Sequence, residues 1–264
     1  AGKGRNLKIG NDHQLVEYIE HKIKKEKWSP AAVLGDLEQK GWPFAVRICV
    51  KTLYNYMDRD LFLGISNKDL LQKKKGTKRA VRKVRKVAWN NRAGKSIEER
   101  PERVNQRKEF GHWEIDLVVG RQGSKPVILT LVERQTRKSI YVLVKNKTQK
   151  EVLQAVRRAH RRVKGDFTQV FKSITADNGS EFLDSKGLQK AAKCDEVYYA
   201  HPFSSWERGS NENGNRILRR FLPKGTDFST LKPRDLKRIE DWVNNYPRKI
   251  FGYKTANDMY AAVA

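Results

Sequence analysis

Two carboxylates stand two positions apart in an apolar, β-branched stretch of the chain, residues 110–120. They are Glu114 and Asp116. Successive side chains of a strand alternate between its two faces, so we expect both acids on one face and Ile115 on the other. Burying a carboxylate on such a strand costs free energy unless a partner binds it. A salt bridge, a hydrogen-bonded turn or a bound ligand would meet that cost.

Further acids follow at the ends of later elements. Asp177 closes an apolar run and precedes an Asn-Gly pair, which is typical of a strand that ends in a turn. Glu207 and Glu212 lie in the polar stretch 205–213, which opens a helix. Three converging carboxylates supply the oxygen ligands that Mg²⁺ prefers. Two such ions about 3.5–4 Å apart can activate the attacking oxygen and stabilise the leaving oxygen in phosphoryl transfer.

Strands and helices that could position these acids alternate over residues 111–222. The predicted order is three antiparallel strands, a helix, a strand, a helix, a strand and a helix. Their predicted ranges are 114–119, 127–132, 139–144, 148–165, 171–177, 181–193 and 196–200, with the last helix after 205. This is the order of a ribonuclease-H-like α/β fold. Its first and fourth strands pair in parallel, so an acid on each could meet at one edge.

Three short helices are predicted within the first 60 residues. Apolar residues recur at a spacing of four over 12–26, and Ser29-Pro30 is a favourable helix start. A third helix is expected at about 50–58. Such a set fits a helix-turn-helix domain, whose last helix enters the major groove of DNA. Its exposed face would carry Lys51, Thr52, Asn55 and Arg59. A plain three-helix bundle with a solvated polar face would show the same pattern.

The charge balance points to a polyanionic partner. The chain has 56 Lys and Arg against 30 Asp and Glu, a net charge of +26, which favours nucleic acid or an anionic membrane surface. No stretch approaches the roughly 18–20 apolar residues of a spanning helix, and the first residues lack a signal-peptide pattern. Cys49 and Cys194 match no zinc spacing and fit a reducing cytosol. We therefore expect a cytoplasmic protein that binds DNA and no membrane.

A run of basic residues suggests where the domains divide. Residues 72–109 form a predicted basic linker between a DNA-binding domain at 1–71 and an α/β domain with C-terminal helices at 110–264. Such runs are extended when free and lie along phosphates when bound. The candidate phosphate contacts are Lys74, Lys78, Arg79, Arg82 and Arg85. A solvated linker without contacts is the alternative.

Several sequence blocks together resemble the DDE transposases of the bacterial insertion-sequence-thirty family. The blocks are GHWEIDLVVG at 111–120, LTLVER at 129–134, DNGSEF at 177–182 and WERGSNEN at 206–213, with PKGTDF at 223–228 and NYPRK at 245–249. Trp28-Ser29-Pro30 and Thr52-Leu53-Tyr54 resemble the family's second helix-turn-helix. The resemblance implies a retroviral-integrase-like mixed sheet flanked by helices. Members usually carry an additional N-terminal helix-turn-helix, so we expect either a truncated chain or a shorter member.

The resemblance also implies which acids are catalytic. Asp116, Asp177 and Glu212 would bind two Mg²⁺ ions, with Mn²⁺ as a substitute. It favours Asp116 over Glu114, which would then be structural, and Glu212 over Glu207. These choices could not be made from the strand pattern alone. The last two acids are 35 positions apart (212 − 177), which suits the integrase-type arrangement.

The family's activity implies DNA partners. A homodimer would bind the insertion-sequence ends, cleave them to give a 3′-OH and transfer that end to target DNA in the bacterial nucleoid. Further DNA contacts are expected beside the acids, from Trp206, Arg208, Arg216, Arg219 and Arg220. An ion pair with Glu212 is the alternative for Arg216, because the two lie four positions apart. The rival functions are a DNA-binding regulator and a nuclease that cuts without joining.

Overall fold

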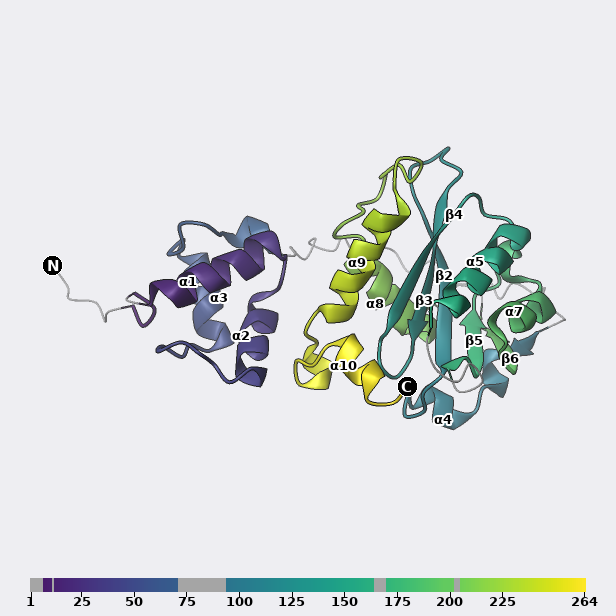
Figure 1. Cartoon of the computed structure of the whole chain (residues 1–264), viewed down its shortest axis with the longest axis horizontal. Helices are drawn as coiled ribbons and strands as arrows, with labels where there is room; N and C mark the ends of the chain where they lie inside the picture. The colour runs from purple at the N-terminus through teal and green to yellow at the C-terminus, as the bar shows by residue number, and fades with distance from the viewer. Residues whose placement is uncertain (1–6, 11, 71–93, 164–169, 202–204) are drawn as a thin grey trace, which may run out of the picture. The chain divides into compact units, whose positions relative to one another are not determined.

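The protein is described from a computed structural model, which covers residues 7–10, 12–70, 94–163, 170–201 and 205–264 (Figure 1). The described residues fall into two compact units. One contains 7–10, 12–70 and 246–255, and the other contains 94–163, 170–201, 205–245 and 256–264. Within the described residues, no helix combines the length and the apolar character needed to cross a membrane.

The first unit has the three expected helices. They are α1 (His13–Glu20), which continues into the π-helical turn η1 (His21–Lys25), α2 (Pro30–Gln39) and α3 (Val50–Asp58), followed by the short η2 (Asn67–Asp69). Ser29 Oγ accepts a hydrogen bond from Ala32 N at 3.2 Å, so the predicted start of α2 is confirmed. Leu15, Ile19, Leu37, Leu53 and Met57 form its buried interior. Three helices are thus present, and their helix-turn-helix role stays a prediction.

A short C-terminal segment belongs to this first unit. Residues Tyr246–Thr255 group with it, although the sequence placed them in the α/β domain. The Tyr246 hydroxyl lies 3.0 Å from Ser29 Oγ. The Tyr253 ring packs on Gly35 of α2, where an added Cβ would lie only 2.1 Å from the ring. The segment contains the single turn η6 (Lys249–Phe251).

The second unit is built on a six-stranded sheet in the order β1-β6-β5-β2-β3-β4. The strands are β1 (Lys95–Ser96), β2 (His112–Val119), β3 (Val127–Glu133), β4 (Ser139–Val144), β5 (Ser173–Ala176) and β6 (Glu196–Tyr199). The β2-β3-β4 meander is antiparallel, whereas β1, β6, β5 and β2 pair in parallel. The expected meander and the expected pairing of the first and fourth strands are therefore confirmed.

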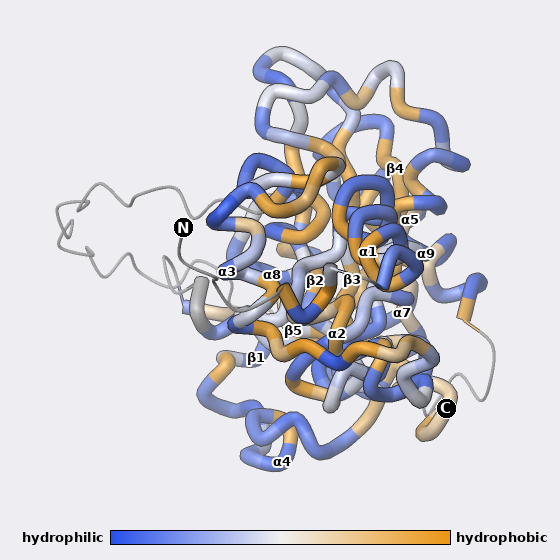
Figure 2. The backbone as a smooth tube through the Cα atoms, turned by 90° about the vertical axis from the view of Figure 1, so that its left-hand side faces the viewer, coloured by the Kyte–Doolittle hydropathy of each residue, from blue (hydrophilic) through white to orange (hydrophobic). Residues whose placement is uncertain are grey.

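Helices cover both faces of this sheet (Figure 1). Ile115 packs with α5 (Gln149–Arg161) and α7 (Ser185–Ala192), whereas Val118 packs with α8 (Gly209–Leu218) and α9 (Pro233–Asn245). The chain continues with α10 (Ala256–Ala261), and the short turns η4 (Ser180–Phe182) and η5 (Ser205–Arg208) precede α7 and α8. Hydrophobic residues run along the central strands (Figure 2). The predicted mixed sheet flanked by helices, a ribonuclease-H-like fold, is confirmed.

Residues 94–109 differ from the expected linker. They form β1, η3 (Ile97–Glu99) and α4 (Glu102–Asn105), and β1 extends the sheet beside β6. A two-residue strand is too short to show an alternating pattern, so the sequence did not predict it. Backbone pairing with β6 holds it in the sheet. Gly94 lies against the Tyr199 ring, where an added Cβ would be 2.0 Å from a ring carbon. This close packing ties the segment to the second unit.

Candidate active site

Two aspartates meet at the junction of two parallel strands. Asp116 lies within β2, and Asp177 follows the last residue of β5. Glu114 is in register with Thr175, and continuing that register by two residues places Asp116 beside Asp177. The two side chains are 22% and 37% exposed. The structure therefore brings these two predicted residues together at an accessible edge.

Each aspartate has one oxygen held in place and one oxygen aimed at a common point. Asn215 Nδ2 donates to Asp116 Oδ2 at 2.6 Å, and the Gly179 backbone N–H donates to Asp177 Oδ1 at 3.0 Å. The remaining oxygens face the guanidinium of Arg208. Its Nη1 lies 3.3 Å from Asp116 Oδ1, and its Nη2 lies 3.0 Å from Asp177 Oδ2. Two carboxylates of different strands thus converge on one cation.

The electrostatics of Asp116 reflect this crowding. Burial raises the pKa of its carboxyl most, the nearby charge of Asp177 raises that pKa further, and Arg208 opposes both. Like charges this close repel unless a cation lies between them. The pair therefore needs positive charge, which Arg208 supplies here.

Glu212 forms no metal-binding group with the two aspartates among the described residues. It is exposed in the first turn of α8, and within the described part of the chain it makes no hydrogen bond or ion pair. No group of three His, Cys, Asp or Glu side chains able to hold a metal ion is found among the described residues. The helix turns Asn215 toward Asp116 instead. At 100° per residue, Glu212 lies about 60° around α8 from Asn215.

Glu114 faces the same helix as Asp116, as its spacing of two predicts. Its side chain is 0% exposed and pairs with Arg134 Nη1 at 2.5 Å. Its other oxygen accepts a hydrogen bond from the Asn211 backbone N–H of α8 at 2.9 Å. Both oxygens are therefore engaged, and this carboxylate binds the sheet to the helix.

Comparisons with known proteins identify the family. Residues 106–202 match the model of the integrase core domain, a segment that contains Asp116 and Asp177 and ends before Glu212. A probable transposase for the insertion-like sequence element IS1161 of Streptococcus salivarius is 43% identical over 82% of this chain and 59% of its own length. The transposase for IS4351 of Bacteroides fragilis is 32% identical over 92% of this chain and 72% of its own length. Transposase InsI for IS30A of Escherichia coli (strain K12) is 31% identical over 88% and 61%. The chain belongs to the IS30-like family of insertion-sequence transposases.

The extent of these matches is partial. This IS30-like chain spans about 60% of the length of the IS1161 and IS30A relatives. Among solved structures, the catalytic core domain of BIV integrase matches with a TM-score of 0.44 at 16% identity, over 58% of this chain and 94% of that one.

The arginines expected to contact DNA in this IS30-like chain already have partners within the protein. Arg208 pairs with the two aspartates and also donates to Ile115 O at 3.2 Å. Arg216 donates to Asn213 Oδ1 at 2.8 Å. Arg219 donates to the backbone carbonyls of Val119, Leu222 and Pro223. The Arg220 guanidinium lies 5.4 Å from the centre of the Trp242 ring. Their DNA contacts stay predictions.

The remaining predicted DNA contacts are placed in part. Lys51 and Asn55 of α3 and Arg59, which follows it, are exposed, whereas Thr52 is half-buried, with its hydroxyl 3.3 Å from Cys49 Sγ. Five predicted linker contacts and the side chain of Trp206 lie outside the described residues, the five being Lys74, Lys78, Arg79, Arg82 and Arg85.

Glu207, the rival third acid, is held elsewhere. It accepts a hydrogen bond from the His201 backbone N–H at 2.8 Å, and its other oxygen lies 2.8 Å from His201 Nδ1. This hydrogen bond is the main cause of a raised pKa of His201, and Glu98 adds to it from 3.2 Å. Both oxygens of Glu207 are therefore engaged by His201.

Three polar residues at the site were missed from sequence. Asn215 faces the sheet, where the Thr130 hydroxyl lies 3.3 Å from its Oδ1, and Asn211 is buried, with its backbone N–H donating to Glu114. Their spacing of four on one helix was a usable signal, because such residues share a face. Thr130 had no such signal, since its place opposite Asp116 depends on the β2–β3 register.

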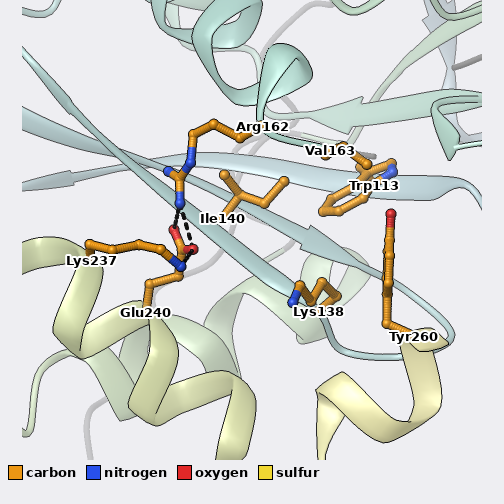
Figure 3. A pocket seen from close by; sticks show the side chains of 8 residues that line it. All are labelled: Trp113, Lys138, Ile140, Arg162, Val163, Lys237, Glu240 and Tyr260. Atoms are coloured by element: carbon orange, nitrogen blue, oxygen red, sulfur yellow. Dashed lines mark hydrogen bonds and ion pairs between the residues drawn. The ribbon is translucent and has the colours of Figure 1, made fainter. Parts of the chain in front are cut away.

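A separate cavity of about 410 Å³ lies beside the edge strand β4 (Figure 3). Three of its charged lining residues pair with one another: Arg162 donates to both oxygens of Glu240 at 2.6 and 2.8 Å, and Lys237 donates to Glu240 at 3.1 Å. Glu240 also accepts from the Tyr141 N–H of β4 at 2.8 Å, and Arg162 donates to Tyr141 O at 2.8 Å. These side chains close the open edge of the sheet. The cavity does not contain the aspartate pair.

Proposed function

We propose that this chain is the DNA-binding and catalytic part of a DDE transposase. It binds the ends of an insertion sequence, cleaves a phosphodiester to release a 3′-OH, and joins that end to target DNA. The observation that supports this most is the convergence of Asp116 and Asp177 on neighbouring parallel strands of an integrase core. Carboxylate pairs of this kind suit phosphoryl transfer.

The carboxylates of Asp116 and Asp177 fit a divalent cation. Each offers one unanchored oxygen, and both oxygens already face a single positive group. Mg²⁺, with Mn²⁺ as a substitute, would be held by these two residues together with Glu212, which is exposed in the first turn of α8 and would have to turn toward them when the metal binds. Bound metal supplies activation of the attacking oxygen and stabilisation of the leaving oxygen. Asn215 and the Gly179 N–H orient the two aspartates, which limits their motion during the reaction.

DNA binding rests on charge and on exposed polar surface. The net charge of +26 favours phosphate contacts, and Lys51 and Asn55 of α3 are exposed, as is Arg59 directly after it. We infer that α3 reads the insertion-sequence ends and that two copies of the protein bring two ends together in the bacterial nucleoid. The linker basic residues would add sequence-independent affinity.

One assay separates the proposed transposase from its rivals. The protein is incubated with duplex oligonucleotides carrying the ends of its element, a target plasmid and Mg²⁺. Joined product that is lost in Asp116→Asn supports the proposal, with a decrease of about 10³-fold expected from the loss of several kcal/mol of transition-state stabilisation. Asp241→Asn, an exposed aspartate on α9 paired with Lys237, is the matched control and should retain activity.

The other outcomes contradict parts of the proposal. Cutting without joining would indicate a nuclease, and DNA binding without either reaction would indicate a regulator. Joining that survives Asp177→Asn would show that the metal ligands are misassigned.

A further inference from the structure

Arg208 occupies the point where the two free carboxylate oxygens of the aspartate pair converge. Its side chain is 13% exposed, less than either aspartate that it contacts. Its Nη1 also donates to Ile115 O of β2 at 3.2 Å. Its Nε is buried without a hydrogen-bond partner among the described residues. A guanidinium with an unused buried N–H is incompletely satisfied, which lowers the cost of moving it away.

The contacts of Arg208 and those of a metal ion would use the same atoms. Asp116 Oδ2 and Asp177 Oδ1 are engaged by Asn215 and Gly179, so Oδ1 of Asp116 and Oδ2 of Asp177 are left for a cation. Mg²⁺ binds oxygens at about 2.0–2.1 Å and demands near-octahedral geometry. A guanidinium 3.0 and 3.3 Å from those same oxygens would repel a divalent cation bound to them. The Arg208 guanidinium and a metal ion therefore cannot occupy this point at the same time.

We propose that Arg208 is a built-in counter-cation, which holds Asp116 and Asp177 together in the metal-free protein and leaves them when a divalent metal binds. The proposal rests on the proposed function, because it takes the two aspartates as metal ligands. Once released, the guanidinium is free to bind a DNA phosphate, the contact predicted for it from the sequence. Metal binding and DNA binding then favour each other, because the metal takes the two aspartates and the DNA phosphate takes Arg208, which otherwise pair with one another.

Arg208 is thus a positioning residue that acts through the aspartates. Without metal it prevents the repulsion that would separate them. During metal loading it competes for the same two oxygens. Its removal should therefore have opposite effects on stability and on metal affinity, a combination that a purely structural arginine would not produce.

The test measures metal binding without catalysis. Mn²⁺ affinity is determined by electron paramagnetic resonance for the wild-type protein and for Arg208→Gln, with thermal unfolding followed in parallel. We expect Arg208→Gln to unfold at lower temperature without metal and to bind Mn²⁺ about tenfold more tightly. Arg238→Gln, an exposed arginine on α9, is the matched control and should change neither. Unchanged or weaker Mn²⁺ binding by Arg208→Gln would overturn the proposal.

Two further measurements keep the outcome interpretable. Arg208→Lys retains the charge but cannot bridge both oxygens with a planar fork, so its Mn²⁺ affinity should lie between the other two, even if Arg208→Gln fails to fold. Asp116→Asn should bind Mn²⁺ far more weakly than the wild type. If it binds Mn²⁺ equally well, the metal site of the proposed function fails, and this result is distinguishable from a failure of Arg208 alone.

Discussion

Glu114 and Asp116 lie two residues apart on β2 and face the same helix, and their surroundings differ sharply. Glu114 is 0% exposed, and its two oxygens are taken by Arg134 and by the Asn211 N–H. Asp116 is 22% exposed and has one oxygen anchored by Asn215. Its other oxygen lies 3.3 Å from Arg208, a cation that it shares with Asp177.

The difference explains why neighbouring carboxylates can serve opposite purposes. A buried acid with every partner supplied stabilises one arrangement and has no oxygen left for a ligand. A partly exposed acid beside a like charge, with one oxygen uncommitted, is suited to binding a cation. The exposed fraction of each side chain and the number of its hydrogen-bonding and ionic partners therefore distinguish a structural carboxylate from a cation-binding one. Residue type and strand face do not, because both are acids on the same face of β2.

The largest expected effect concerns Glu114. Glu114→Gln leaves Arg134 charged and buried with one partner lost, so we expect the free energy of unfolding to fall by about 3–5 kcal/mol. Asp116→Asn should cost about 1 kcal/mol or less, because Arg208 keeps Asp177 as its partner. Urea denaturation of the two variants measures both values. Equal losses of unfolding free energy in the two variants would show that Glu114 and Asp116 do not differ in their structural role.

A smaller effect is expected from the residue that anchors Asp116. Asn215→Ala removes the hydrogen bond to Asp116 Oδ2 and lets that carboxylate rotate, so joining should slow by about 10-fold, equivalent to about 1.4 kcal/mol. Asn213→Ala on the same helix makes the same change in helix propensity at an exposed position. Single-turnover joining rates measure the effect. Equal rates in both variants would mean that anchoring Asp116 does not matter.

Local patterns predicted what depends on short-range geometry. Alternation along β2 placed Glu114 and Asp116 on one face, and the order of elements predicted the parallel pairing of β2 and β5 that brings Asp177 near. These inferences succeeded because strand periodicity and chain connectivity are encoded within a few tens of residues.

Contacts between side chains of different elements could not be predicted from such local patterns. Arg134 meets Glu114 only because the β2–β3 register places them together, and Arg208 meets the aspartates only because of how α8 begins. The rotation of α8 that leaves Glu212 exposed buries Asn211 and turns Asn215 toward Asp116. The spacing of Asn211 and Asn215 indicates that they share a helix face, but no residue type or spacing in the sequence specifies which residues that face, Arg134 or Arg208 will contact.

The smallest expected effect concerns Glu207. Its side chain is 19% exposed, a value between those of Glu114 and Asp116. Its partner His201 has a pKa raised mainly by their hydrogen bond. The bond therefore stabilises the fold fully below the unfolded pKa of about 6.5, and this contribution is lost as pH rises through the higher folded pKa. The effect should be small, because His201 is 36% exposed. The melting temperatures of wild type and His201→Gln should thus differ most near pH 6 and converge as the pH rises above the raised pKa of His201. In a Glu207→Gln background the same substitution should show little of this pH dependence, and a difference that persists there would assign it to Glu98 instead.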